Sequence, residues 1–320
     1  MTEKYRERLK IAKYYHNDGL TQQEIADKLN VSRPTVSNAL KKAKEEGIIQ
    51  VRVVDIKNKG GLVNLEQELK DAYDLKEVRL VDCNSEKYED LINCIGATAA
   101  LYLEDIINDN LKIGISWGST LKSMVDNLSG NKRINNLELV TLVGGSGNLK
   151  PEVHSNILSD KILSKFNGRG YFLYAPAVVD SQDVWQALMK NDETQKLLEK
   201  ARNVDIALVG IGAPIGSSNL VETGYFEKEQ IKEMQNLGVA GDICSRFFDE
   251  EGQVCDLEIN KRTIGINLDD LKNINEVIGV AGGEEKVSSI VGALKGGFLD
   301  VLITDAKTAK LVLEKNKRGV

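Results

Sequence analysis

Apolar and polar residues follow two different patterns along the chain. In the first 56 residues, apolar positions recur three and four apart, which predicts a helix over about Glu3–Asn17 and shorter helices after Thr21 and Ser32. Beyond them, an amphipathic helix at Leu62–Tyr73 is followed by short apolar runs that alternate with helical patterns. This alternation predicts an α/β domain with a mainly parallel sheet covered on both faces. The candidate strands are Glu77–Val81, Lys112–Ser116, Leu137–Val143, Ile206–Gly210, Val277–Val280 and Val301–Thr304.

The first 56 residues predict a small winged helix-turn-helix domain. Residues 21–24 form a capping box, in which the Thr21 hydroxyl accepts the backbone N–H of Glu24 and the Glu24 carboxylate reaches back. Ser32 caps the third helix, and Pro34 lies in its first turn, where a missing N–H costs little. Residues Ile48–Ile56 alternate enough to form a strand or wing. A three-helix protein-binding module is the alternative that these signals leave open.

The third predicted helix has the composition of a helix that reads DNA. Its inward-facing residues are expected to be Val36, Ala39, Leu40 and Ala43. Short polar side chains at the front of a basic helix are what the reading of bases in the major groove requires. The residues expected to contact DNA are Thr21, Gln22, Ser32, Arg33, Pro34, Thr35, Ser37, Asn38 and Lys41.

Charge is divided unevenly between the two regions. The net charge of −6 by itself argues against nucleic acid. Residues 1–56, however, carry 11 Lys and Arg against 8 Asp and Glu, and the predicted third helix has no acidic residue between Ser32 and Lys44. A basic helix on an acidic body fits a DNA-binding domain joined to a larger domain with another task. A solvated helix surface has the same pattern, so charge alone does not decide.

Length and composition exclude several classes of protein. At about 150 residues per domain, 320 residues predict about two domains, which we place at residues 1–56 and 62–320 with a linker at 57–61. The longest apolar run, Ile206–Gly216, is too short to span a bilayer, and the charged N-terminus has no apolar signal segment. Two histidines without an H-E-x-x-H motif give no support for a metal site, and no cofactor is expected.

The cysteines are expected to be reduced. They lie far apart in the sequence, without a C-x-x-C pair, which is typical of packed thiols in a cytoplasmic protein. The four are Cys83, Cys94, Cys244 and Cys255.

Four glycine-containing loops fall at the ends of predicted strands, where ligands of parallel sheets bind. They are Gly114–Thr120, Gly144-Gly145-Ser146, Gly210–Pro214 and Gly282-Gly283, the last followed by Lys286. In the first loop, free N–H groups at a helix start and the hydroxyls of Ser119 and Thr120 form a cradle for an anion. The first loop lacks the spacing of a nucleotide-triphosphate loop, and the third lacks the last glycine of a dinucleotide fingerprint. Each loop alone is more often a plain turn, but together they favour a phosphate-bearing ligand.

Single residues near these loops each have a structural alternative. Lys286 could be a surface lysine or a charge partner for a ligand. Asp242 could only cap a turn, or it could accept hydrogen bonds from ligand hydroxyls. His154 is more often a packed or solvent-facing residue than a ligand contact. Trp117 could fill the core beside the first loop.

Several of these segments together resemble the SorC family of bacterial sugar-responsive regulators. The resemblance covers essentially the whole chain and, within the family, is nearest to the deoxyribonucleoside regulator type. The segments that carry it are Thr21–Ala26, Ser32–Ser37, Gly114–Thr120, Gly241–Asp249, Arg262–Gly265 and Ala281–Leu294.

The resemblance implies a fold and a set of partners. The effector domain is expected to be similar to the fold of glucosamine-phosphate deaminase and ribose-phosphate isomerase. The protein is expected to be a cytoplasmic homotetramer whose binding to operator DNA is controlled by a phosphorylated sugar. The candidate effector-binding residues, from the glycine loops and the resemblance together, are Trp117, Gly118, Ser119, Thr120, Gly144, Gly145, His154, Gly210, Gly212, Asp242 and Lys286.

One position departs from the family pattern. In relatives a basic residue occurs just before the Gly-Gly pair of the second loop, whereas this chain has Val143 there. The side chain of Val143 can only pack, so reversible, noncovalent binding of the effector is expected.

Three functions remain in competition. The leading one is a transcriptional regulator of carbohydrate or nucleoside catabolism, with no enzymatic activity. The second is a sugar-phosphate isomerase or deaminase with a fused DNA-binding domain. It is disfavoured because no carboxylate–histidine pair with general-base spacing occurs at the loops, although Asp242 and Lys286 could act as base and acid. The third is a protein-interaction module with a vestigial ligand site.

Overall fold

The computed structural model describes residues 3–49, 59–83, 85, 87–145, 150–213, 226 and 228–318. They separate into two compact units, Met1–Asn58 and Lys59–Val320. Helix α4 (Lys59–Tyr73) begins three residues earlier than predicted, so residues 59–61 are helical and not part of a linker.

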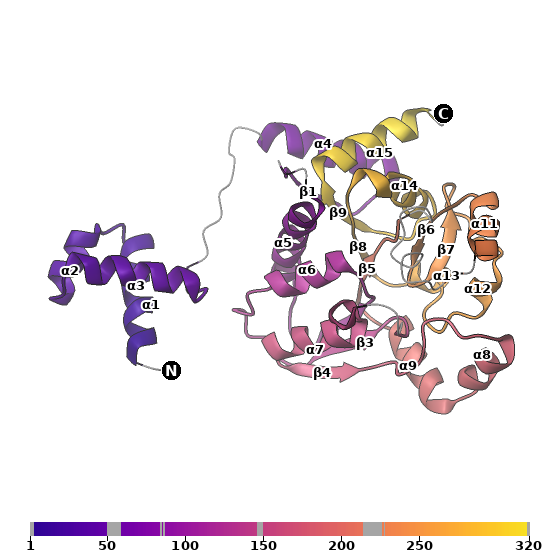
Figure 1. Cartoon of the computed structure of the whole chain (residues 1–320), viewed down its shortest axis with the longest axis horizontal. Coiled ribbons are helices and arrows are strands. Elements are labelled where there is room, and N and C mark those ends of the chain that lie inside the picture. Colours follow the sequence, from indigo (N-terminus) through magenta and orange to yellow (C-terminus); the bar gives the residue numbers. More distant parts are fainter. Residues whose placement is uncertain are drawn as a thin grey trace. The chain divides into compact units, whose positions relative to one another are not determined.

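The N-terminal unit is built from three helices around a small apolar core (Figure 1). These are α1 (Glu3–His16), α2 (Gln22–Leu29) and α3 (Arg33–Glu45). Ile11, Ile25 and Val36, one from each helix, are fully buried at its centre. In α1, Ile11 faces this core, whereas Tyr5 is exposed.

The predicted helix caps of this unit are present. The Thr21 hydroxyl accepts the Glu24 N–H at 3.3 Å, and the Thr21 N–H donates to the Glu24 carboxylate at 2.8 Å. The Ser32 hydroxyl accepts the N–H of Thr35 at 3.3 Å. Of the wing predicted at residues 48–56, only 48 and 49 are described, and they form a bend. The rest of that prediction lies outside the described residues.

The second unit contains a seven-stranded parallel sheet in the order β1-β9-β8-β5-β2-β3-β4. Six of these strands match predicted runs. The strand β4, which reads Gly-Arg-Gly-Tyr, was not predicted because it lies at the sheet edge and has no apolar run. The strands are β1 (Glu77–Val81), β2 (Lys112–Ile115), β3 (Leu137–Thr141), β4 (Gly168–Tyr171), β5 (Ile206–Gly210), β8 (Glu276–Val280) and β9 (Val301–Asp305).

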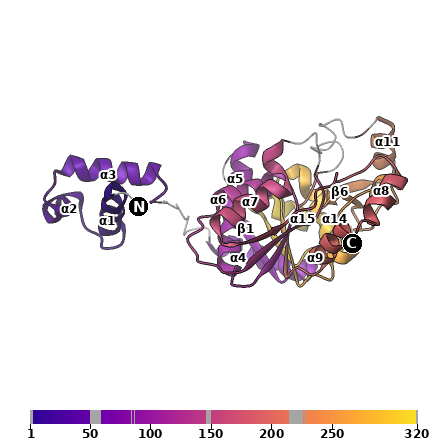
Figure 2. The ribbon, with the colours of Figure 1, turned by 90° about the horizontal axis from the view of Figure 1, so that it is seen from below.

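Helices cover both faces of this sheet, as the alternating pattern predicts (Figures 1 and 2). Because side chains of a strand point alternately to opposite faces, Ile206 and Leu208 belong to one core and Ala207 and Val209 to the other. The first core lies under α5 (Tyr88–Ile106), α6 (Ser119–Asn127) and α7 (Ser155–Lys165). The second lies under α4, α9 (Asp192–Arg202), α13 (Leu268–Leu271), α14 (Val287–Lys295) and α15 (Ala306–Arg318).

An antiparallel pair of strands, β6 (Val239–Ile243) and β7 (Arg246–Asp249), stands apart from the main sheet and was not predicted. Its two-residue turn, Cys244-Ser245, has left-handed φ angles of 53° and 59°. The remaining helices are α8 (Gln182–Met189), α11 (Lys228–Asn236), α12 (Glu258–Lys261) and two short 3-10 helices, η2 (Pro151–Val153) and η3 (Glu284–Lys286). No described helix is long and apolar enough to cross a bilayer.

The expectation of four reduced cysteines is wrong for one pair. Cys83 and Cys94 form a disulfide, with Cα atoms 6.2 Å apart. Cys83 lies two residues after β1 and Cys94 lies in α5, a contact that sequence spacing did not reveal. Cys244 and Cys255 are free and buried.

Candidate effector site and DNA-binding helix

The loops that follow β2 and β5 are in contact at the carboxyl edge of the sheet. The Ser116 hydroxyl accepts a hydrogen bond from the Gly210 N–H at 3.2 Å. A Cβ on Gly210 would lie 3.3 Å from the carbonyl oxygen of Trp117. Since β2 and β5 are neighbours in the sheet, the structure brings the first and third predicted glycine loops together.

Helix α6 begins at the end of the first loop, and its first amide groups are suited to hold an anion. Gly118 precedes the helix with φ of 146°, a conformation that favours glycine. Within the described part of the chain, no side chain caps this helix start. Thr120 is buried and Ser119 is half-buried beside it. Because N–H groups at a helix start attract negative charge, these residues have the arrangement of the predicted anion cradle.

His154 connects the second glycine loop to the first. A Cβ on Gly145 would lie 3.4 Å from Nδ1 of His154. The adjacent carbonyl, that of Val153, accepts the N–H of Gly118 at 3.1 Å. His154 therefore lies between the two loops.

The N–H groups of the second loop are already used by the backbone. Gly144 donates to the carbonyl of Ile264 at 3.0 Å, and Gly145 donates to that of Ala175 at 2.9 Å. These glycines therefore allow the backbone to pack closely and do not offer free donors to an anion. Val143, immediately before them, is fully buried.

Asp242 and Lys286 both form hydrogen bonds with the backbone of the third loop. Gly212 donates its N–H to the carbonyl of Asp242 at 2.8 Å, and a Cβ on Gly212 would lie 2.8 Å from Cγ of that residue. The Lys286 ammonium donates to the carbonyl of Ile211 at 2.7 Å. Only a residue without a side chain fits at position 212.

The protonation of this pair is set mainly by burial. Burial raises the pKa of Asp242 to about 6, although the Ser245 N–H at 3.2 Å and the charge of Lys286 favour the ionised form. Burial lowers the pKa of Lys286, against the attraction of Asp242 and Glu285. Oδ2 of Asp242 accepts the Ser245 N–H in the turn between β6 and β7, while Oδ1 lies beside Gly212. Both roles considered from the sequence are compatible with its position.

Eight of the eleven predicted effector residues form a series of contacts at the sheet edge. Trp117 packs its ring against two apolar clusters, but its Nε1–H has no hydrogen-bond partner among the described residues. Residues 146–149 and 214–225, which extend the second and third loops, lie outside the described residues. The path runs through Gly145, His154, Gly118, Trp117, Gly210, Gly212, Asp242 and Lys286.

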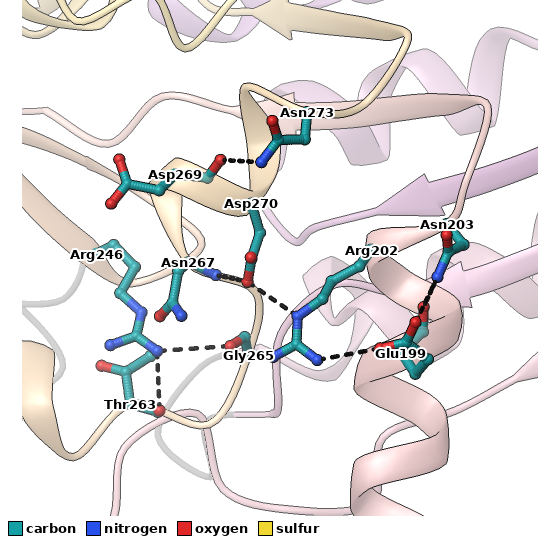
Figure 3. A network of polar contacts seen from close by, with 10 residues as sticks. All are labelled: Glu199, Arg202, Asn203, Arg246, Thr263, Gly265, Asn267, Asp269, Asp270 and Asn273. Atoms are coloured by element: carbon teal, nitrogen blue, oxygen red, sulfur yellow. Dashed lines mark hydrogen bonds and ion pairs between the residues drawn. The ribbon is translucent and has the colours of Figure 1, made fainter.

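Sequence reasoning gave no role to Arg246, which holds the strand-like segment behind the second loop (Figure 3). Its guanidinium donates to the carbonyls of Thr263 at 3.2 Å and Gly265 at 3.5 Å. The residue between them, Ile264, is the one whose carbonyl accepts the Gly144 N–H. Burial lowers the pKa of Arg246 to about 10, so it stays charged at neutral pH. Arg246 and residues 262–265 both lie in segments that carry the family resemblance. This could have indicated that the two segments are in contact.

A second arginine in the same region joins α9 to α13 (Figure 3). Arg202 Nε donates to Asp270 at 3.1 Å, and Asp270 also accepts the N–H of Asn267 at 3.4 Å. This ion pair fixes α13 against α9 and is not part of the path described above.

Helix α3 and the starts of α2 and α3 carry the predicted DNA-contacting side chains, most of which are exposed to solvent. Thr21, Arg33, Pro34, Thr35, Ser37, Asn38 and Lys41 are exposed, as is Ser32, while Gln22 is half-buried. Val36 and Ala43 are fully buried on the opposite side. The helix therefore has the polar and apolar faces that the sequence predicts.

Comparison with known proteins accounts for both units. A homeodomain-like domain model matches residues 2–52, and a sugar-binding domain model, Sugar-bind, matches residues 57–314. The deoxyribonucleoside regulator of Bacillus subtilis is 35% identical over 311 residues, which are 97% of this chain and 98% of that protein. The chain belongs to the SorC family of sugar-binding transcriptional regulators.

The likeness to SorC-family proteins extends over the full length. The sorbitol operon regulator of Klebsiella pneumoniae is 31% identical over 96% of this chain and 97% of its own. The crystal structure of that full-length regulator, SorC, has a TM-score of 0.83 at 30% identity and covers 98% of this chain and 100% of its own. A helix-turn-helix unit followed by an α/β domain is thus the shared SorC architecture.

This SorC-family protein is therefore a sugar-responsive, DNA-binding transcriptional regulator. Its relatives are regulators and not enzymes, which confirms the choice against an isomerase or deaminase. The expected likeness to the deoxyribonucleoside regulator type is confirmed as well.

Proposed function

We propose that the effector of this regulator is a phosphorylated sugar that binds along the path from Gly145 to Lys286 and changes the affinity of a cytoplasmic homotetramer for its operator. The genes it controls would serve carbohydrate or nucleoside catabolism. The observation that carries the proposal is the start of α6, where Gly118, Ser119 and Thr120 present amides and hydroxyls at the carboxyl edge of the sheet.

The phosphate is assigned to the start of α6. The helix dipole and the first N–H groups favour a doubly charged oxyanion, and the two hydroxyls add donors. Ser119 and Thr120 lie on the first turn of this nine-residue helix, after Gly118. The phosphate can approach the backbone closely there because Gly118 has no side chain.

The sugar hydroxyls are assigned to Asp242 and Lys286, with His154 on the side of the second loop. An ionised carboxylate accepts hydroxyl hydrogen bonds strongly, and a lysine ammonium donates them. Gly212 lets Asp242 pack against the third loop, and Gly210 lets the third loop approach the first. Binding is noncovalent: Val143 offers no amine at the second loop, and Lys286 acts as a charge partner for the ligand.

Operator DNA is assigned to α3 and the start of α2. Arg33 and Asn38 are exposed near the front of α3 and are of the types that read guanine and adenine edges. Lys41 lies further along the helix and is assigned to a backbone phosphate.

A thermal-shift panel of matched sugars tests the ligand class. The intact protein is heated with deoxyribose 5-phosphate, sorbitol 6-phosphate and other sugar phosphates, each against its unphosphorylated form. At about 100 times its Kd, a ligand adds about 2.7 kcal/mol to the unfolding free energy. We expect at least one phosphorylated sugar to raise Tm while its unphosphorylated form does not. Equal stabilisation by the unphosphorylated form would remove the phosphate from the proposal.

The proposed assembly is tested separately. Sedimentation equilibrium of the intact chain, with a mass of 35.3 kDa per protomer, should give a species of four protomers. A stable monomer or dimer at micromolar concentration would contradict the tetramer without affecting the ligand class.

A further inference from the structure

The disulfide between Cys83 and Cys94 lies in a position that no function described above uses. Cys83 follows β1, and Cys94 lies in the second turn of α5. Both residues are half-buried, and Cys83 lines a cavity through which a small thiol can approach the bridge. The bridge closes a short loop, with 11 residues of separation, around the start of α5.

The other two cysteines of the chain do not share this accessibility. Cys244 and Cys255 are both buried. Burial raises the pKa of the Cys255 thiol to about 11, and burial also raises that of Cys244. Since the thiolate is the reactive form, thiol chemistry at neutral pH is confined to the half-buried pair.

The loop that carries Cys83 faces the fourth glycine loop. A cavity of ≈ 450 Å³ is lined by Cys83, Tyr88 and Leu91 from one side and by Gly283, Asp305 and Thr308 from the other. Both walls of the cavity lie at the carboxyl ends of β1, β8 and β9. A displacement of Cys83 therefore alters the surroundings of Gly283.

Helix α5 also packs directly on the fourth glycine loop. An added Cβ on Gly282 would collide with the side chain of Ile95, the residue after Cys94, and would lie 2.6 Å from Oδ2 of Asp305. The N–H of Gly283 donates to Asp305 at 3.2 Å and to the Thr308 hydroxyl at 2.8 Å. Ile95 fills the space beside Gly282, so a displacement of α5 at Cys94 has to change the packing of the loop at that point as well.

The fourth glycine loop leads directly to the proposed effector site. Lys286 ends the short helix η3 after Gly283 and donates to the carbonyl of Ile211 in the third loop. A continuous series of contacts thus joins the disulfide, α5, the Gly282–Lys286 loop and the third loop.

We propose that Cys83 and Cys94 form a reversible thiol–disulfide switch that sets the conformation of the Gly282–Lys286 loop and thereby the response of the regulator to its effector. The inference goes beyond the proposed function and does not depend on which sugar binds. In the proposed cytoplasmic location, disulfides are mostly transient or redox-sensing, which fits an accessible bridge beside a ligand site.

A low-molecular-weight thiol such as glutathione supplies the electrons that reduce the disulfide. The thiolate of one such molecule attacks a sulfur of the bridge, and the released cysteine sulfur takes a proton. A second small thiol then attacks the mixed disulfide. Two small thiols become one small disulfide, while the protein gains two electrons and two protons as two Cys thiols. Glutathione disulfide drives the reverse reaction.

Thiol trapping on the intact protein tests the switch. The protein is equilibrated in buffers of graded glutathione to glutathione disulfide ratio, alkylated with N-ethylmaleimide and mapped by mass spectrometry. We expect labels on Cys83 and Cys94 to appear together as the buffer becomes reducing and to disappear together when it is reoxidised. Cys255→Ser, which removes a thiol away from the pair, should give the same curve. Labels on both residues at every ratio would overturn the proposal.

Hydrogen exchange tests the link to the effector site without any ligand. Peptides that contain residues 282–286 should exchange at least about 3-fold faster in the reduced than in the oxidised wild type, because the packing of α5 loosens. Cys83→Ser should match the reduced form in both buffers. Peptides of α3, in the other unit, should not change. Equal exchange of residues 282–286 in the oxidised and reduced wild type, a comparison that needs no variant, would refute the coupling.

Discussion

Replacing Gly212 by alanine introduces a methyl group where the third loop meets Asp242. The new Cβ would lie 2.8 Å from Cγ of Asp242, and closer still to Oδ1, whereas ordinary contacts begin at 3.4 Å. The carboxyl group has to move by more than half an ångström. Asp242 is only 5% exposed and accepts the Ser245 N–H at 3.2 Å, so it cannot move without losing this bond.

The expected magnitude follows from these contacts. Inserting a methyl group into a filled site costs about 1–3 kcal/mol of stability. A displaced carboxylate loses hydrogen bonds to the ligand, and such charged bonds contribute about 1.5–3 kcal/mol each. Gly212→Ala should therefore weaken effector binding by about 10- to 100-fold. Operator binding without effector should persist, because the N-terminal unit is untouched.

Calorimetry with the sugar phosphate identified by the thermal-shift panel measures this effect, and an electrophoretic mobility assay measures operator binding. Thermal unfolding of Gly212→Ala without effector is the control: a folded variant with wild-type operator binding shows that the loss is confined to the effector site. Wild-type effector affinity in Gly212→Ala would refute the placement of Asp242 in the site.

Four further predictions test the effector site and the DNA-binding helix. Thr120→Asp places a negative charge at the start of α6, so effector binding measured by calorimetry should be lost while operator binding persists; unchanged affinity would remove this helix start from the site. Because burial raises the pKa of Asp242 to about 6, the folded protein holds this proton more tightly than the unfolded chain. The contribution of Asp242 to the unfolding free energy should be full below about pH 4 and lost as the pH rises through about 6. Urea unfolding across this range should show the decline in the wild type, and Asp242→Asn should lack it. Arg33→Ala should weaken specific operator binding by about 1–3 kcal/mol, whereas Lys41→Ala should weaken binding to all sequences and lower the slope of log K against log salt by about 1. Borohydride treatment with the effector present should leave the protein mass unchanged, because Val143 provides no amine; a stable mass increase on any lysine would show covalent capture.

The helix-turn-helix unit and the central strands were predictable because their signals are local. The capping box at Thr21 and the cap at Ser32 each depend on residues three apart. Runs such as Ile206–Gly210 are buried on both faces and therefore consist of apolar residues and glycine. Strand β4 gave no such signal, since an edge strand needs less apolar surface.

The candidate site was predictable only in part. Glycine pairs and hydroxyls at strand ends indicated which loops to join, and the sheet order brings these loops together. The contact of His154 with Gly145 and the reach of Arg246 to Thr263 depend on how separate loops fold back on one another. The disulfide between Cys83 and Cys94 was missed for the same reason: sequence spacing does not say which way a chain turns after a strand.

The position of β9 has a consequence for synthesis of the protein on the ribosome. This strand is made among the last elements, yet it lies between β1 and β8 in the sheet. The three helices at the N-terminus make contacts close in sequence and can fold as soon as they emerge, whereas the large sheet cannot close until residues 301–305 have left the tunnel. During translation, the edge of β1 that will pair with β9 stays unpaired until nearly all of the effector domain has been made. A nascent chain can thus carry a folded DNA-binding unit before it has any means of sensing sugar.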